Sequence, residues 1–265
     1  MLLRCRASYE AQITANVGLS DTNYRILNMA FRGKLIASGA DAKTIKGNGD
    51  KYETAIMYMM PWKSAGINVC ANAEIAGCID GCLFKAGRGA FNTVQAARAR
   101  KTAWFAADRD GFMAQLVIDT TKFIKYCGKQ GVTPVIRLNG TSDIRWERIP
   151  IGDFASIFEM FPQVQWYDYT KIANRKTDHI KNYHLTFSYS DANPLYAKQV
   201  KIAMEKGMNM AVVWRSVDVI PRMFMGVPVI SGDADDLRFL DPDGVMVSLY
   251  AKGPAKKDTS GFVQD

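Results

Sequence analysis

The fold follows most directly from one stretch, HLTFSYSDANPLYAKQVKIAMEKGMNMAVVWRS at residues 184–216. Short apolar runs at 184–189 and 209–214 lie on either side of a helix-like segment at 193–207. A strand, a helix and a second strand in this order form a crossover unit whose two strands run parallel. The stretch therefore predicts an α/β protein with a parallel sheet.

The same alternation of strands and helices continues on both sides of this unit. Residues 91–131 repeat apolar side chains at three- and four-residue spacing, which predicts one or two helices. Further apolar runs of strand length occur at 54–62, 134–138, 164–169, 227–230 and 244–250. Right-handed crossovers between these strands would curl the sheet toward a barrel or a doubly wound sheet.

A chain of 265 residues is long enough for one large core. We expect a single (β/α) domain at 51–252, an N-terminal extension at 1–50 that decorates it, and a mobile tail at 253–265. The sequence contains no secretory signal and no run of about 20 apolar residues. It therefore predicts a cytoplasmic protein without a membrane partner.

Three of the five cysteines lie close together in the loop at 69–90, which follows the first long apolar run. Cys70, Cys78 and Cys82 have the spacing C-x7-C-x3-C. A reducing cytosol disfavours disulfides, so three readings stay open. The thiols could hold an iron–sulfur cluster, could hold zinc with a fourth ligand, or could pack as small apolar residues. The fourth zinc ligand would be His179, His184 or Cys127. We favour the cluster because the loop follows a strand of a β/α pattern.

Polar residues follow the predicted strands at the point where each one ends. They form the segments NGTSD, DYTK, SYSD, WRS and SGDAD, which begin after positions 138, 167, 187, 213 and 230. Ligands of parallel α/β folds bind at the carboxyl ends of the strands, where these loops gather. We therefore expect the cysteines and these polar groups to meet at one rim.

The formal charge of +8 makes nucleic acid, or another anionic ligand, a candidate partner. Residues 81–107 contain five basic side chains and no acidic one. We expect Arg88, Arg98 and Lys101 to face an anion, such as a cluster ligated by thiolates, and Arg100 to be solvated.

The order of these features resembles the architecture of radical S-adenosylmethionine (SAM) proteins, although their usual cysteine spacing is C-x3-C-x2-C. The chain resembles more closely a phage family known as gene product 88, whose members look like divergent radical-SAM proteins. The matching pieces span roughly residues 60–215. They are CANAEIAGCIDGCL, AGRGA, ARARKTAWF, VIRLNGTSDIRWE, WYDYTK, LTFSYSD and VVWR.

This resemblance implies a partial (β/α) barrel of radical-SAM type. It also implies a four-iron, four-sulfur (4Fe-4S) cluster on Cys70, Cys78 and Cys82 at the barrel rim, in the cytoplasm of a bacterial host. SAM is the candidate small-molecule cofactor. By position, the resemblance assigns its contacts to Asn139, Gly140, Asp143, Ser190, Asp191 and Arg215, although LNGTSD lacks the usual G-G-E. The alternative is a non-enzymatic iron–sulfur or zinc protein that binds nucleic acid or a host partner, in which the metal is structural or senses redox state.

Overall fold

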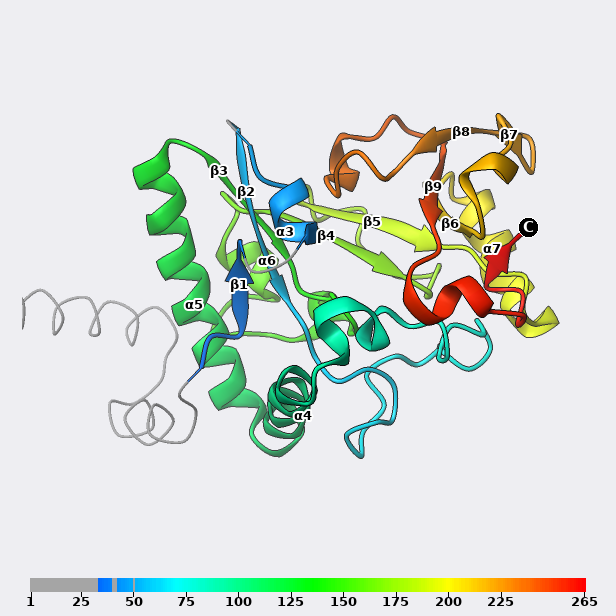
Figure 1. The fold of residues 1–265 in the computed structure, drawn as a ribbon. Helices are drawn as coiled ribbons and strands as arrows, with labels where there is room; N and C mark the ends of the chain where they lie inside the picture. Colours follow the sequence, from blue (N-terminus) through cyan, green and yellow to red (C-terminus); the bar gives the residue numbers. More distant parts are fainter. Residues whose placement is uncertain (1–32, 40–41, 50) are drawn as a thin grey trace, which may run out of the picture.

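A sheet of ten strands runs through the part of the chain that the computed structural model describes, residues 33–39, 42–49 and 51–265 (Figure 1). Its order is β1-β2-β3-β4-β5-β6-β9-β8-β7, with β10 paired to β6. The strands are β1 (Ile36–Ser38), β2 (Tyr52–Met57), β3 (Thr133–Arg137), β4 (Gln165–Thr170), β5 (Tyr183–Ser188), β6 (Met210–Trp214), β7 (Met223–Phe224), β8 (Val227–Ser231), β9 (Met246–Tyr250) and β10 (Val263–Gln264).

Local signals in the sequence explain where α5 (Arg109–Gln130) begins and ends and where α7 (Pro194–Glu205) begins. Asp108 accepts a hydrogen bond from the Gly111 amide at the start of α5, and Gly131 ends that helix with a φ of 71°. Asn193 caps α7 in the same way, ahead of Pro194 in the first turn. The α-helices are α3 (Ala42–Lys46), α4 (Asn92–Ala107), α5 (Arg109–Gln130), α6 (Ile157–Met160) and α7 (Pro194–Glu205). The short 3-10 helices are η1 (Leu83–Lys85), η2 (Gly87–Ala90), η3 (Trp146–Arg148), η4 (Val217–Val219), η5 (Arg238–Leu240) and η6 (Gly253–Lys257).

The sheet is mostly parallel and open. Strands β2, β3, β4, β5, β6, β9 and β8 run parallel, whereas β1 and β7 pair antiparallel at the two ends. Among the described strands, these two ends do not pair with each other, so the sheet does not close. The predicted α/β class, parallel sheet and strand positions are confirmed.

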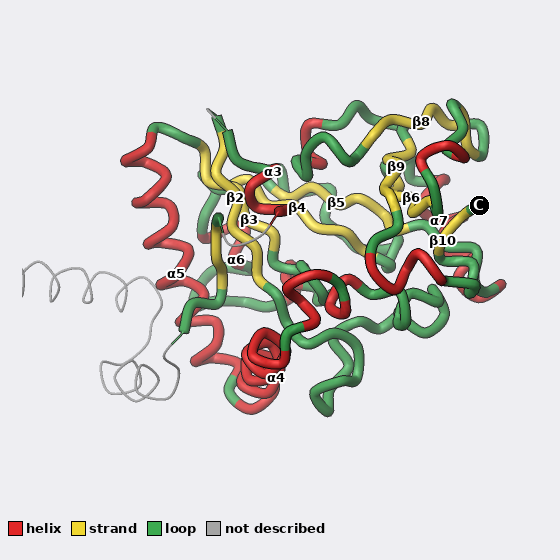
Figure 2. The backbone as a smooth tube through the Cα atoms, viewed as in Figure 1, coloured by secondary structure: helices red, strands yellow, loops and turns green. Residues whose placement is uncertain are grey.

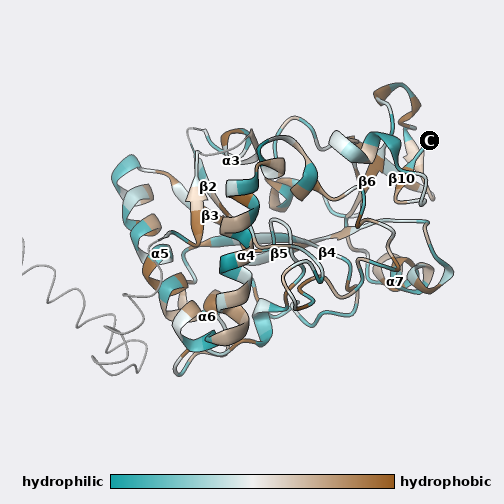
Figure 3. Ribbon diagram, turned by 60° about the horizontal axis from the view of Figure 1, so that its bottom comes forward, coloured by the Kyte–Doolittle hydropathy of each residue, from teal (hydrophilic) through white to brown (hydrophobic). Residues whose placement is uncertain are grey.

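One face of the sheet is covered by helices. Ile136 of β3 and Trp166 of β4 share an apolar core with Phe112 and Leu116 of α5. Further along, α7 packs in a second core that contains residues of β5 and β6. Figure 3 shows the apolar strands β2 and β3 and the alternation of polar and apolar residues along α5, as expected for a helix that packs one side on a sheet.

The opposite face of the sheet is filled at one end and hollow at the other. Val135 and Tyr167 pack there against Leu237, which closes the amino-terminal end of the parallel strands. Toward the carboxyl ends, Arg137 and Tyr169 line a cavity. The side chains of β3 and β4 alternate between the two faces, so these strands both build the helix-covered core and form the cavity wall.

The two terminal segments differ from the expected decoration and mobile tail. In the extension, β1 pairs with β2 as an edge strand of the sheet, whereas residues 1–32 lie outside the described residues. In the expected tail, β10 pairs with the end of β6 and buries Val263. Figures 1 and 2 show this segment beside the cysteine loop. Residues 253–265 therefore belong to the folded domain, because β6 extends beyond the end of β5 and leaves an edge for β10 to pair with.

Gly140, in the loop after β3, provides a test of this packing. A Cβ atom there would lie 2.7 Å from both Ile56 Cγ2 and the Met57 carbonyl of β2. We expect Gly140→Ala to lower the free energy of unfolding by about 1–3 kcal/mol, because the loop must move off the sheet. Urea denaturation measures this change. Gly128→Ala is the control: a Cβ there meets no atom within 4 Å, and the change should stabilise α5 by about 0.5 kcal/mol. Equal effects of the two substitutions would contradict the tight packing.

Candidate functional site

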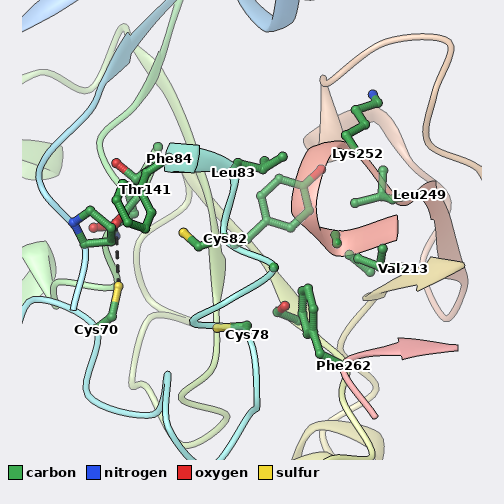
Figure 4. A pocket seen from close by; sticks show the side chains of 18 of the residues that line it. Cys70, Cys78, Cys82, Leu83, Phe84, Thr141, Val213, Leu249, Lys252 and Phe262 are labelled. Atoms are coloured by element: carbon green, nitrogen blue, oxygen red, sulfur yellow. Dashed lines mark hydrogen bonds between the residues drawn. The ribbon is translucent and has the colours of Figure 1, made fainter. Parts of the chain in front are cut away.

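The three clustered cysteines line one cavity at the carboxyl ends of the parallel strands. Cys70, Cys78 and Cys82 contribute to a cavity of about 430 Å³, whose other walls come from the loop after β3, the end of β4, strands β6 and β9, and residues 253–265. Figure 4 shows the three sulfur atoms directed toward the same region between them. Four of the five predicted strand-end segments, NGTSD, DYTK, SYSD and SGDAD, contribute residues to this cavity, whereas WRS does not.

Three hydrogen bonds from strand ends fix the cysteine loop, which consists mainly of turns (Figure 2). The Asp143 amide, after β3, donates to the Val69 carbonyl at 2.7 Å. The Asn72 side chain donates to the carbonyl of Lys171, after β4, at 2.7 Å. The Ser190 hydroxyl, after β5, donates to the carbonyl of Ala76 at 2.7 Å. Each anchor lies beside a cysteine, so the strand ends determine where the thiols lie.

The thiols differ in their exposure to solvent. Cys70 is 9% exposed and Cys78 is 8% exposed, whereas Cys82 is half-buried. Burial raises the pKa of Cys70 to about 12 and also raises the pKa of Cys78, although Lys171 acts against both shifts. The thiol of Cys70 points to the Thr141 carbonyl at 3.6 Å (Figure 4). A positive charge or a metal is therefore needed to make these buried thiols into thiolates.

Lys171 is the positive charge at this position. It directly follows β4, is half-buried, and lines the same cavity. Burial acts to lower its pKa, but the Cys78 thiol, Asp143 and Cys70 raise the pKa above the ordinary lysine value. The site residues predicted from the sequence do not include Lys171. The sequence feature that could have identified Lys171 is its position at the end of a predicted strand, in the segment DYTK.

Asn139 and Gly140 line the cavity, but the Asn139 side chain is occupied within its own loop. Its Oδ1 accepts hydrogen bonds from the Ser142 hydroxyl at 2.8 Å and the Ile144 amide at 2.9 Å, and its Nδ2 donates to the Ile144 carbonyl at 3.0 Å. Gly140 has no room for a side chain beside β2. These two residues therefore shape the wall through the backbone.

Asp143 and Ser190 lie behind the cavity wall. The Asp143 carboxylate accepts from the Thr170 hydroxyl at 2.8 Å and from the Lys171 amide at 2.7 Å, and forms a buried ion pair with Arg175 at 3.5 Å. Ser190 holds Ala76 as described. The structure brings both residues next to the cysteine loop, where their side chains support its backbone.

Asp191 and Arg215 do not join the cysteines. The Asp191 side chain is exposed, and its amide donates to the Gly261 carbonyl. Arg215 donates to the carbonyls of Lys256 at 2.9 Å and Asp258 at 2.8 Å and pairs with Asp265. Arg215 thus fastens residues 253–265 to the end of β6.

The predicted anion-facing residues lie away from the cavity. Arg98 is buried in α4 with its guanidinium 4.7 Å from the ring centre of Tyr58, and the ammonium of Lys101 donates to the Leu35 carbonyl at 3.0 Å. Arg88 is exposed in η2. These residues lie close to the cysteines in sequence but not in space, because the chain turns between η2 and α4.

A buried polar cluster forms another part of the cavity wall. Arg137 pairs with Asp236 at 3.1 Å, and the hydroxyls of Tyr167 and Tyr169 donate to the same carboxylate at 3.0 and 3.2 Å. The site residues predicted from the sequence do not include this cluster. The available signals were the arginine that ends β3 and Asp236, which directly follows the segment SGDAD.

The described residues contain no group of three or more His, Cys, Asp or Glu side chains arranged to hold one metal ion. Zinc requires ligands within about 2.0–2.3 Å of a single point. The proposed fourth ligands also lie elsewhere: Cys127 is a buried core residue of α5, and His184 lines a separate cavity. His179 is exposed in a turn before β5. None of these three residues lines the cavity that the cysteines share.

One family model, described as gene product 88, matches residues 33–265. The chain belongs to the gene product 88 family. The match extends beyond the pieces at 60–215 and includes both β1 and the C-terminal segment beside the cysteine loop. Comparisons with curated proteins and with solved structures find no match. In the described part of this family member, no helix is long and apolar enough to cross a bilayer.

Lys101 tests whether the basic residues of α4 serve the fold of this family member. Burial and the neighbouring Arg98 lower the pKa of Lys101 to about 8, below its unfolded value of 10.5. Between these values the unfolded chain binds more protons, so Lys101 makes the folded state more stable as pH rises from 8 to 10.5. We expect Lys101→Met to lose this gain in urea unfolding at pH 7 to 10. If the free energies of unfolding of the wild type and of Lys101→Met changed in parallel with pH, the lowered pKa of Lys101 would be contradicted.

Arg215 tests the C-terminal wall. Arg215→Gln removes the hydrogen bonds to the carbonyls of Lys256 and Asp258 and the ion pair with Asp265, so the segment should detach more often and expose Cys82. We expect iodoacetamide to alkylate Cys82 of the metal-free protein several-fold faster, because the thiol is open to the reagent whenever the segment is detached. Mass spectrometry measures the rate. Arg222→Gln, at an exposed site, should leave it unchanged, and an unchanged rate in Arg215→Gln would show that the segment does not shield Cys82.

Proposed function

We propose that the chain binds a 4Fe-4S cluster through Cys70, Cys78 and Cys82. The observation that carries this proposal is the convergence of three thiols from one loop on one cavity (Figure 4). Each cysteine of such a cluster binds a different iron atom, so the three sulfur atoms surround a volume instead of a point. This donor set fits a cluster better than a single ion.

We further propose SAM as the cofactor, with radical-SAM chemistry as the activity. Three cysteines leave one iron of the cluster without a protein ligand. The cavity beside the thiols has a volume in the range of small-molecule sites and is lined by Trp62, Phe84 and Tyr250. An open parallel sheet with helices on one face and a cavity on the other also supports a partial barrel of radical-SAM type. When bound together, cluster and SAM supply one-electron cleavage of a carbon–sulfur bond and hydrogen abstraction from a substrate.

The chain's own residues would bind the cluster and the cofactor, orient the substrate and shield the cavity from water. The cysteines would hold the cluster, and the loop after β3 would shape the wall for the cofactor. Arg137 and Tyr169 line the cavity and Asp236 holds them in place, so they are suited to orient a polar group of a substrate. Ala255 and Phe262 from the C-terminal segment would exclude water.

The second candidate is a non-enzymatic iron–sulfur protein that binds nucleic acid or a host partner in the bacterial cytoplasm. The net charge of +8 favours nucleic acid as its ligand. In this case the cluster would stabilise the loop or sense redox state, and SAM would have no effect on it.

Anaerobic purification followed by iron, acid-labile sulfide and zinc analysis separates these functions. We expect four irons and four sulfides per chain and a reduced-state electron paramagnetic resonance spectrum that shifts when SAM is added. A cluster that is indifferent to SAM, together with salt-dependent binding of DNA or RNA, would favour the second candidate. Zinc without sulfide would contradict both.

Substitution of single cysteines tests the ligand assignment. Cys70→Ala, Cys78→Ala and Cys82→Ala should each lose most of the iron and sulfide, because each removes one of three protein ligands. Cys127→Ala should retain both, since Cys127 lies on α5 in the apolar core, away from the cavity. Cys5→Ala is a second control, at a position outside the described residues. Full iron and sulfide in Cys78→Ala would overturn the assignment.

A further inference from the structure

We propose that Lys171 is the counter-charge that raises the reduction potential of the cluster; this inference rests on the proposed function. Lys171 lies on β4's carboxyl end, far in the sequence from the cysteine loop, yet it lines the cavity together with all three thiols. It interacts electrostatically with each of them.

The backbone of Lys171 is held from two sides. Its amide donates to the Asp143 carboxylate at 2.7 Å, and its carbonyl accepts from the side chain of Asn72 in the cysteine loop, also at 2.7 Å. The Asp143 amide in turn donates to the carbonyl of Val69, directly before Cys70. The contacts form a closed ring between the loop after β3, the end of β4 and the cysteine loop. The backbone of Lys171 therefore cannot move away from the cysteine loop without breaking these contacts.

The other cations of the cavity wall already have partners of opposite charge or polarity. Lys85 pairs with Asp80 at 3.4 Å, Lys252 pairs with Asp233 at 3.4 Å, and Arg137 pairs with Asp236 at 3.1 Å. Lys46 donates to the Asp233 carbonyl. Lys171 lines the cavity with the thiols and forms no ion pair among the described residues, so its charge is available to the group that the thiols hold.

A cluster held by three thiolates carries a net negative charge, and reduction adds one more electron to it. A fixed cation in a site of low dielectric constant stabilises the reduced form more than the oxidised form. The effect is a less negative reduction potential. In the titration proposed below, dithionite supplies the electron, and no bond forms or breaks.

The test is a potentiometric titration followed by electron paramagnetic resonance in the absence of SAM. Lys171→Gln and Lys171→Met remove the charge, and Lys171→Arg keeps it. We expect both neutral variants to hold the cluster at a more negative potential than the wild type, and Lys171→Arg to lie near the wild type. The matched control is Lys85→Gln, which removes a half-exposed lining lysine and should leave the potential unchanged.

Several outcomes would overturn the inference. One is an unchanged potential in neutral variants that hold a full cluster; if these variants also bind SAM more weakly, Lys171 would instead serve the cofactor. Another is loss of the cluster from both neutral variants and its retention in Lys171→Arg, which would show that the charge of Lys171 is needed to assemble the cluster and does not set its potential. Absence of iron and sulfide from the wild type would overturn the proposed function itself, a result distinct from these.

Discussion

The site depends on one constraint: a loop with little regular secondary structure must hold three largely buried thiols. Burial removes water from the loop's backbone, whose polar groups then need partners in the protein. The partners are the ends of three parallel strands, through Asp143, Asn72 with Lys171, and Ser190. Because parallel strands all end at the same edge, these anchors lie side by side and hold successive turns of the loop. The mostly parallel sheet therefore determines the geometry of the thiols.

The anchors are themselves held by buried charge. Asp143 accepts hydrogen bonds from the end of β4 and pairs with Arg175, which also pairs with Glu147. A buried carboxylate is stable only while such partners remain, so the network has few alternative arrangements. The polar residues behind the wall thus contribute rigidity, and those on the wall contribute the chemistry of the cavity. This division separates Asp143 and Ser190 from Lys171 and Arg137.

Hydrophobic periodicity was sufficient to predict the fold class, because parallel strands buried on both faces appear as apolar runs such as 209–214. It also placed the cysteine loop at the strand ends. It could not predict which way side chains point beyond a turn. Arg98 and Lys101 lie near the cysteines in sequence, but α4 directs them to Tyr58 and to the Leu35 carbonyl. Lys171 lies far away in sequence, and only the register of β4 brings it to the thiols. The segment 253–265 looked mobile because a strand as short as β10 leaves no periodic pattern.

The position of β10 has a consequence for the order in which the site is completed during translation. A chain is synthesised from its N-terminus, so the cysteine loop and the strands that anchor it leave the ribosome before residues 253–265. Until that segment docks beside β6, the side of the cavity near Gly81 lacks Ala255 and Phe262. Before docking, the cysteine loop is therefore uncovered on the side that residues 253–265 cover in the folded domain. The order of the sequence therefore separates synthesis of the cysteine loop from completion of its cavity wall.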